Sequence, residues 1–117
     1  MKKIILALLF VLLIPIAASA FNLTGTWTSD TGGTYYIRQI GSEVFWYGEN
    51  DPTTPTWTNV ANGKCHVTRV ILSWADVPKG AVLQSGILVL KVLNAGNTLE
   101  TVTKTGGFVD ATWTRNP

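Results

Sequence analysis

Residues 32–49, which read GGTYYIRQIGSEVFWYGE, constrain the fold more than any other part of the sequence. Two β-rich runs flank Gly41-Ser42, and glycine at the first central position predicts a two-residue type II′ turn. That turn fixes the strand register and places Tyr35 opposite Gly48, where a large ring needs a small neighbour. One face of the hairpin then carries residues suited to a core: Tyr35, Ile37, Val44 and Trp46. The other face carries an outward aromatic patch with two glutamates: Tyr36, Arg38, Phe45 and Tyr47, with Glu43 and Glu49.

The stretch LVLKVLNAGNTLETVT predicts a second hairpin by the same reasoning. A turn at residues 94–97 puts Lys91 opposite Glu100 on the outer face, where their opposite charges attract. The same turn puts Val92 opposite Leu99 on the inner face. Two hairpins with consistent inner and outer faces are typical of an antiparallel sheet that is buried on one side.

The chain beyond residue 20 shows no run of helical periodicity. Short β-branched and aromatic runs alternate instead with clusters of Gly, Asn, Asp and Pro. We expect eight strands, at residues 24–30, 34–40, 43–49, 57–65, 69–75, 86–93, 98–104 and 109–115. One turn stays open: Asn62-Gly63 is a strong hairpin signal, whereas a turn around residues 66–68 gives strands of better-matched length and is favoured.

The connections between these strands sort into two ends of an up-and-down sheet. The long connections share one end: residues 30–33, 49–56, 76–85 and 105–108. The tight turns share the other end: residues 41–42, 66–68 and 94–97. Because an even number of strands in a meander can close and remove its exposed edges, we predict an all-β, eight-stranded antiparallel up-and-down barrel. Such a barrel has a lumen that side chains can fill, or that can hold one small ligand at the long-loop end.

Residues 1–20 have the pattern of a secretory signal peptide: a basic MKK start, an apolar run and a small-residue ASA end. The alternative is an uncleaved membrane anchor. We expect residues 21–117 to form one barrel domain that is secreted or periplasmic, with no membrane association after cleavage. Removal of Lys2 and Lys3 from the nine basic residues leaves seven, which balance the seven acidic residues. A nucleic-acid partner, which would need clustered Lys and Arg, is therefore not expected.

Residues with catalytic chemistry are few. Cys65 is the only cysteine, so an internal disulfide is excluded; a buried thiol is favoured over an intermolecular bridge. His66 is the only histidine, and neighbouring strand residues face opposite ways, which opposes a Cys–His pair. Glu43 and Glu49 share a face but lie about 20 Å apart at strand rise, too far for paired-carboxylate catalysis. We expect a protein that is not an enzyme and that uses no cofactor or metal.

The two ends of the predicted barrel carry a further pattern. LTGTW opens the first strand, ATWTR closes the last, and both lie at the tight-turn end. This resembles the calycins (lipocalins, avidins and their relatives), in which a Gly-x-Trp on the first strand packs near a basic residue on the last. The matching residues are Gly25, Trp27 and Arg115, and the resemblance implies that they plug the closed end of the barrel. TGTWTSDTGGTYYI is most similar to the opening of avidin-type proteins. GGTYYIRQIG, FWYGE and WADVPKG also resemble strings from small uncharacterised bacterial secreted proteins.

The resemblance also suggests where a ligand would bind. Avidins place a polar residue two positions after the Trp, and use several tryptophans and an aspartate at the open end. A pocket with apolar walls and a few polar groups is the usual small-molecule site. The candidates here are Ser29, Tyr35, Trp57, Trp74 and Asp110. Biotin is not expected, because Gly33 stands where a ureido-binding serine would be. Asp110 conflicts in parity with Trp113 unless the last strand bulges.

These observations favour two functions. The first is a secreted binding barrel that holds a small apolar or amphiphilic molecule at its open end. The second uses the outward aromatic patch with a filled lumen, either as a protein-interaction surface, including a homo-oligomer, or for stacking on sugar rings. The bulk of the inward side chains, among them Trp27, Trp46 and Leu72, weighs against the first function because it leaves little empty space in the lumen.

Overall fold

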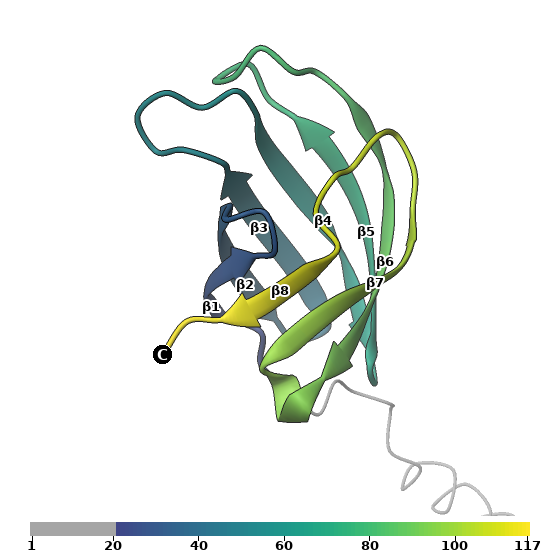
Figure 1. Cartoon of the computed structure of the whole chain (residues 1–117). Helices are drawn as coiled ribbons and strands as arrows, with labels where there is room; N and C mark the ends of the chain where they lie inside the picture. The colour runs from purple at the N-terminus through teal and green to yellow at the C-terminus, as the bar shows by residue number, and fades with distance from the viewer. Residues whose placement is uncertain (1–20) are drawn as a thin grey trace, which may run out of the picture.

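The computed structural model describes residues 21–117, which form a closed barrel of eight antiparallel strands in meander order (Figure 1). The elements are β1 (Gly25–Ser29), β2 (Thr34–Ile40), β3 (Glu43–Glu49), β4 (Thr58–His66), β5 (Arg69–Asp76), β6 (Ser85–Leu93), η1 (Asn94–Gly96), β7 (Thr98–Lys104) and β8 (Thr112–Arg115). The predicted signal peptide at residues 1–20 lies outside the described residues. Within residues 21–117, no helix has the length and apolar character needed to cross a membrane.

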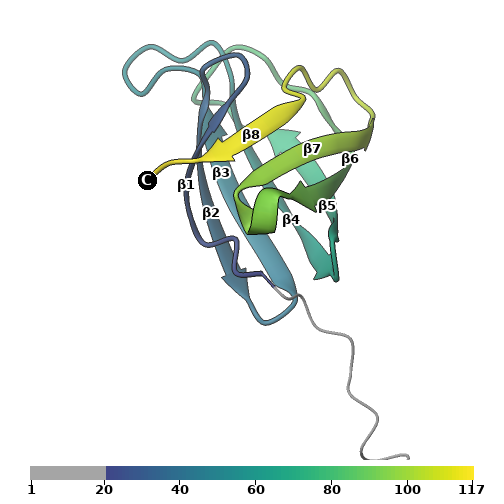
Figure 2. The ribbon, with the colours of Figure 1, turned by 60° about the horizontal axis from the view of Figure 1, so that its bottom comes forward.

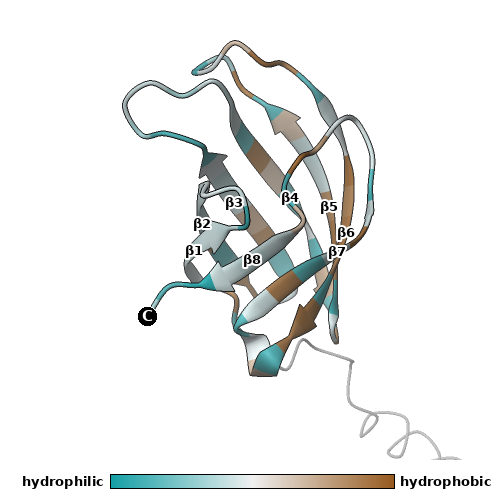
Figure 3. Cartoon of the chain, viewed as in Figure 1, coloured by the Kyte–Doolittle hydropathy of each residue, from teal (hydrophilic) through white to brown (hydrophobic). Residues whose placement is uncertain are grey.

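The registers of both predicted hairpins are confirmed. Tyr35 pairs with Gly48 between β2 and β3, and Gly41 has a φ of 60°, as the first position of a type II′ turn requires. Between β6 and β7, Lys91 pairs with Glu100, and their side chains form an ion pair of 3.4 Å. Inner and outer residues alternate along β5, where Val70, Leu72 and Trp74 are buried and Ile71 and Ser73 are exposed. Figure 3 shows hydrophobic residues along much of β6 as well.

The turn between β4 and β5 lies at residues 67–68, as favoured, because His66 pairs with Arg69. The Asn62-Gly63 pair therefore lies inside β4 and forms no turn. Gly63 has a packing reason to be glycine, since a Cβ there would collide with the backbone carbonyl of Ile71 in β5. Val67 adopts a φ of 56° in this tight turn, a left-handed conformation that is strained for a β-branched residue.

The last strand is shorter than predicted. β8 begins at Thr112, whereas the sequence pattern suggested a start at residue 109. It pairs with β1 on one side and β7 on the other, which closes the sheet (Figure 2). The connection between β7 and β8, residues 105–111, runs across the open end of the barrel (Figure 1).

The inward residues fill most of the lumen. They include the core residues predicted from the first hairpin and large side chains from most other strands: Trp27, Tyr35, Ile37, Val44, Trp46, Leu72, Leu88, Leu90, Leu99 and Trp113. Cys65 is also buried, in agreement with the favoured interpretation, whereas His66 is exposed on the opposite face of β4. These side chains leave little room in the lower part of the barrel.

Candidate functional site

The closed end of the barrel is held by Arg115 and Trp27. The guanidinium lies over the indole, with its Cζ 4.6 Å from the ring centroid. Arg115 also donates to three backbone carbonyls, those of Asn22 at 2.7 Å, Thr24 at 2.8 Å and Gly96 at 2.9 Å. One side chain thus ties the N-terminal segment, β8 and the η1 turn together, which makes this end structural.

Gly25 gives the plug its room. A Cβ at this position would lie 3.1 Å from Arg115 Nη1, tighter than an ordinary contact. Trp27 is fully buried, and its Nε1 donates to the carbonyl of Leu23 at 3.0 Å. The structure therefore brings Gly25, Trp27 and Arg115 together at the tight-turn end, where the sequence placed them.

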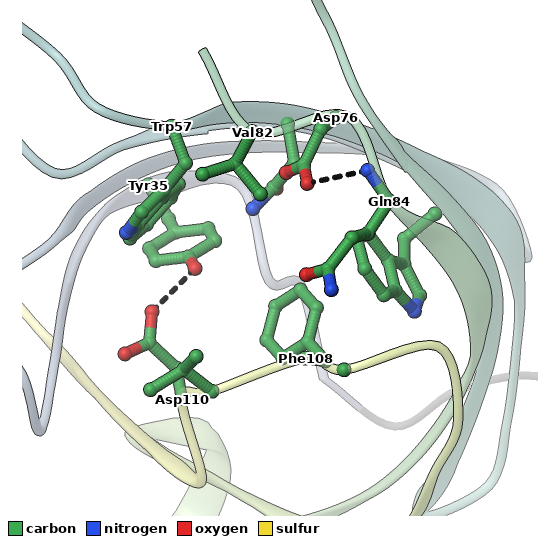
Figure 4. Close-up of a pocket in the computed structure, with 11 residues that line it drawn as sticks. Tyr35, Trp57, Asp76, Val82, Gln84, Phe108 and Asp110 are labelled. Carbon is green, nitrogen blue, oxygen red and sulfur yellow. Dashed lines mark hydrogen bonds between the residues drawn. The ribbon is translucent and has the colours of Figure 1, made fainter. Parts of the chain in front are cut away.

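The open end contains a cavity of about 320 Å³ (Figure 4). Its apolar walls come from two strands and three connections: Tyr35, Trp57, Trp74, Val82, Phe108 and Val109. Its polar lining consists of two carboxyl and two amide side chains: Asn59, Asp76, Gln84 and Asp110. A volume near 300 Å³ is at the small end of the range for ligand pockets, so it suits a compact molecule.

Four of the five predicted ligand residues line this cavity, namely Tyr35, Trp57, Trp74 and Asp110. Ser29 does not. The 30–33 connection folds back on the end of β1, so that Ser29 Oγ accepts a 2.9 Å hydrogen bond from the Gly33 amide. The hydroxyl is buried in that turn and serves the backbone of the loop.

Asp110 faces inward although Trp113 does too, which resolves the parity conflict. Asp110 precedes β8, and the chain there is fixed by Asp30, whose carboxylate accepts from the Ala111 amide at 3.1 Å. Because residues 109–111 are not paired as a regular strand, strand alternation does not apply to them. No bulge within β8 is needed to turn Asp110 toward the lumen.

The Asp110 carboxylate is 1% exposed and is held by two hydroxyl donors. Tyr35 Oη donates to Oδ2 at 2.5 Å, and Thr31 Oγ1 donates to Oδ1 (Figure 4 shows the Tyr35 bond). Burial, followed by the nearby Asp110 charge, raises the pKa of Tyr35 far above its ordinary value of 10.0. The phenol therefore stays protonated and acts as a fixed donor to the carboxylate.

Asn59 forms part of the cavity lining that sequence reasoning missed. It is buried, and its Oδ1 accepts a 2.9 Å hydrogen bond from Trp46 Nε1. A signal was available, because Asn59 lies on β4 at the same parity as inward Ala61 and Cys65. A polar residue on an inward row near the open end of a barrel is a candidate for ligand contact.

Further missed residues lie at the end of β5 and on the long connections. Asp76 and Gln84 bracket the β5–β6 loop and bond each other through backbone and side chain: Gln84 N donates to Asp76 Oδ2 at 2.9 Å, and Asp76 N to Gln84 O at 2.7 Å. Partial burial raises the pKa of Asp76, while the Gln84 amide bond opposes that shift. Phe108 reaches the cavity from the β7–β8 loop.

An aromatic cluster forms the floor of the cavity. Tyr35 meets Trp46 edge to face at 5.0 Å between centroids, and Trp113 in the same manner at 5.7 Å. Phe108 packs against Trp74 at 4.8 Å on the opposite side. Because these rings interlock below the mouth, a ligand in the cavity would lie on them and would not enter the lower barrel.

The comparisons with known proteins identify no relative. No protein-family model matches the chain, and comparisons with curated proteins and with solved structures find no match either. The resemblance to calycins, based on Gly25, Trp27 and Arg115, stays a prediction. Within residues 21–117, no group of three or more His, Cys, Asp or Glu side chains could hold a metal ion.

The outward aromatic patch is present on β2 and β3. Tyr36 is 50% exposed and stacks on Tyr47, with centroids 6.4 Å apart and planes inclined by 18°. Phe45 is 39% exposed and pairs with exposed Arg38 across the strands. The row continues onto β4, because Tyr47 pairs with Val60, which is also exposed.

One member of this face differs from the sequence expectation. Glu49 was expected to face solvent beside Tyr47, but it is only 6% exposed. Lys79, from the β5–β6 loop, covers it and forms a 3.3 Å ion pair with its Oε1. The parity of Glu49 is as predicted, and the loop that covers it could not be placed from strand alternation.

Proposed function

We propose that this protein is a secreted, non-enzymatic binding barrel that holds one small apolar or amphiphilic molecule at its open end. The cavity of about 320 Å³ is the observation that carries the proposal, since it lies above a filled lumen and opposite a sealed end. Secretion rests on the signal-peptide pattern of residues 1–20. N-terminal sequencing of protein recovered from the cell envelope or medium tests it, with Phe21 expected as the first residue.

The composition of the cavity supports binding of a compact molecule. Aromatic walls supply apolar area and flat stacking surfaces, and the few polar groups are fixed by hydrogen bonds within the protein. Preorganised groups of this kind bind without a large ordering cost. The calycin resemblance is consistent with the proposal, because members of that group hold ligands at the open end of a barrel.

A thermal-shift screen of small molecules tests this function directly. A ligand present at about 100 times its dissociation constant stabilises the fold by about 2.7 kcal/mol. For a domain of this size, that corresponds to a rise in Tm of at least about 10 °C. Compounds that raise Tm should also change the tryptophan fluorescence, since Trp57 and Trp74 line the cavity.

A blocking variant separates cavity binding from binding elsewhere. Val82→Trp places a large ring at the rim of the cavity, where Val82 is 37% exposed. Val102→Trp is the matched control, because Val102 on β7 is similarly exposed and does not line the cavity. Hits should lose affinity with Val82→Trp and keep it with Val102→Trp; equal behaviour of the two variants contradicts the proposed site.

The outward aromatic patch supports a second candidate function. Exposed stacked rings on a sheet face are typical of an interface with protein or with sugar rings. If the patch forms a homo-oligomer, Tyr36→Ser and Tyr47→Ser should lower the mass measured by sedimentation. If it binds glycans, the same variants should abolish glycan-dependent Tm shifts. If the chain is monomeric and no glycan shifts its Tm, neither homo-oligomer formation nor glycan binding by the patch is supported.

A further inference from the structure

We infer that the open-end cavity selects a ligand that carries a protonated amine on a compact aromatic or apolar body. The inference rests on the proposed function and adds the charge of the ligand to it. It follows from the sign of the charges that line the cavity, from the way in which its buried carboxylate is satisfied, and from the rings around it.

The carboxyl side chains that line the cavity favour a positively charged ligand. Asp76 reaches the cavity from the end of β5 and Asp110 from the β7–β8 loop, and no Lys, Arg or His occurs among the described residues that line it (Figure 4). Lys79 belongs to the same loop as Gln84, but its ammonium group bonds Glu49 and the carbonyl of Pro52. The cavity thus has two carboxyl groups and no cation of its own.

Asp110 is a buried carboxylate whose hydrogen bonds come from neutral donors. Tyr35 and Thr31 each use one lone-pair site of the carboxylate. A carboxylate has about four such sites, so acceptor capacity is left on a group that borders the cavity. The ion pairs found among the described residues involve Glu43, Glu49 and Glu100, and neither aspartate of the cavity takes part in them.

A buried carboxylate without a cation is unfavourable, since it has lost hydration and gained no opposite charge. An ammonium group beside Asp110 would supply that charge together with charge-assisted hydrogen bonds, which are about twice as strong as neutral ones. A carboxylate or phosphate ligand would face repulsion from both aspartates. The arrangement therefore discriminates by charge, in addition to shape.

The rings around the carboxylates favour the same class of ligand. Trp57 lies beside Tyr35, with centroids 6.0 Å apart, and Trp74 packs with Phe108 on the other side. Aromatic faces attract ammonium groups and also stack on flat apolar bodies. At about 30 Å³ for each water, the cavity has the volume of about ten waters, which suits one ring with a short amine chain.

Three isosteric probes test the inference: phenethylamine, phenethyl alcohol and phenylacetate. Their dissociation constants are measured by titration calorimetry on residues 21–117 produced without the signal segment, with folding checked by circular dichroism. The amine should bind at least about tenfold more tightly than the alcohol, and phenylacetate should bind most weakly. Equal affinities, or tighter binding of the acid, would overturn the inference and leave the small-molecule cavity in place. Failure of all three at millimolar concentration would overturn the inference and count against the proposed function as well.

Two further measurements tie selectivity to the aspartates. Asp76→Asn should reduce the preference for the amine over the alcohol at least about threefold, while Glu100→Gln, an exposed charge change on β7, should leave it unchanged. Because Asp110→Asn disturbs a buried network, its effect is interpreted only if the variant folds. Raising the salt concentration on the unmodified chain should weaken amine binding and leave alcohol binding constant. A preference that responds to neither Asp76 nor salt contradicts an electrostatic origin.

Discussion

Gly48→Ala probes the contact on which both the core and the cavity floor depend. Tyr35 lies over Gly48, and a Cβ at residue 48 would stand 2.5 Å from Tyr35 Cδ2 and 2.9 Å from Cζ. The ring cannot move aside easily, because Trp46 and Trp113 hold it on two sides and Asp110 holds its hydroxyl. One added methyl group must therefore displace a fully buried aromatic side chain.

The expected cost follows from these constraints. Overpacking a core costs about 1–3 kcal/mol. Displacement of the Tyr35 hydroxyl from the Asp110 carboxylate costs about 1.5–3 kcal/mol more, since the acceptor is charged. Alanine recovers about 0.5–1 kcal/mol by restricting the unfolded chain. The net loss of unfolding free energy is about 1.5–5.5 kcal/mol, which lowers Tm by at least about 6 °C in a domain of this size.

A double-mutant cycle by urea denaturation isolates the contact. In a Tyr35→Val background no ring stands over residue 48, so Gly48→Ala should cost less than about 1 kcal/mol there. The difference between the two backgrounds measures the clash itself. If Gly48→Ala costs nothing in the native sequence, or costs the same in both backgrounds, the ring does not rest on the glycine and the reasoning is wrong.

Three other perturbations follow from the described contacts. Arg115→Met keeps the apolar stem over Trp27 but loses three hydrogen bonds to backbone carbonyls, and should lower the unfolding free energy in urea by about 2–4 kcal/mol; Arg115→Lys should restore only part of it. Val67→Gly should raise that free energy by about 0.5–1 kcal/mol, because its φ of 56° is strained for valine, whereas Thr68→Gly should lower it. Asp76 has a pKa raised by burial, so its ionisation opposes folding, and stability from this group falls as pH rises through 3.8 and above it. The Tm of Asp76→Asn relative to the native chain should accordingly increase from acid to neutral pH; a constant difference would contradict the shift.

Much of the barrel could be predicted because its determinants are local. A short turn of known length fixes which residues of its strands pair, and alternation then decides which side chains face inward. The bounds of β2 and β3, and the partners of Tyr35 and Lys91, follow from that rule alone. The rule was ambiguous at Asn62-Gly63, where matched strand length outweighed a strong turn signal.

The cavity could be predicted only in part, because local patterns do not determine the course of the long connections. Tyr35 and Trp74 lie on strands, so alternation placed them inward correctly. Gln84 and Phe108 lie on long connections, whose course over the open end depends on packing that no periodic pattern encodes. Ser29 shows the opposite error. Its position on β1 predicted a hydroxyl that lines the cavity, but the hydroxyl accepts a hydrogen bond from Gly33 in the following turn instead.

Tyr35 belongs to both the core and the cavity, since its ring packs in the core and its hydroxyl bonds Asp110 at the border of the cavity. The ring requires glycine at residue 48, and that requirement is visible in the sequence as a cross-strand pair. The hydroxyl, once the ring is fixed, holds the Asp110 carboxylate at the border of the cavity. A charge that would otherwise favour solvent is thereby kept inside an aromatic site. The packing that closes the lower barrel thus also sets the electrostatics of its mouth, so the chemistry of the cavity depends on the register of the first hairpin.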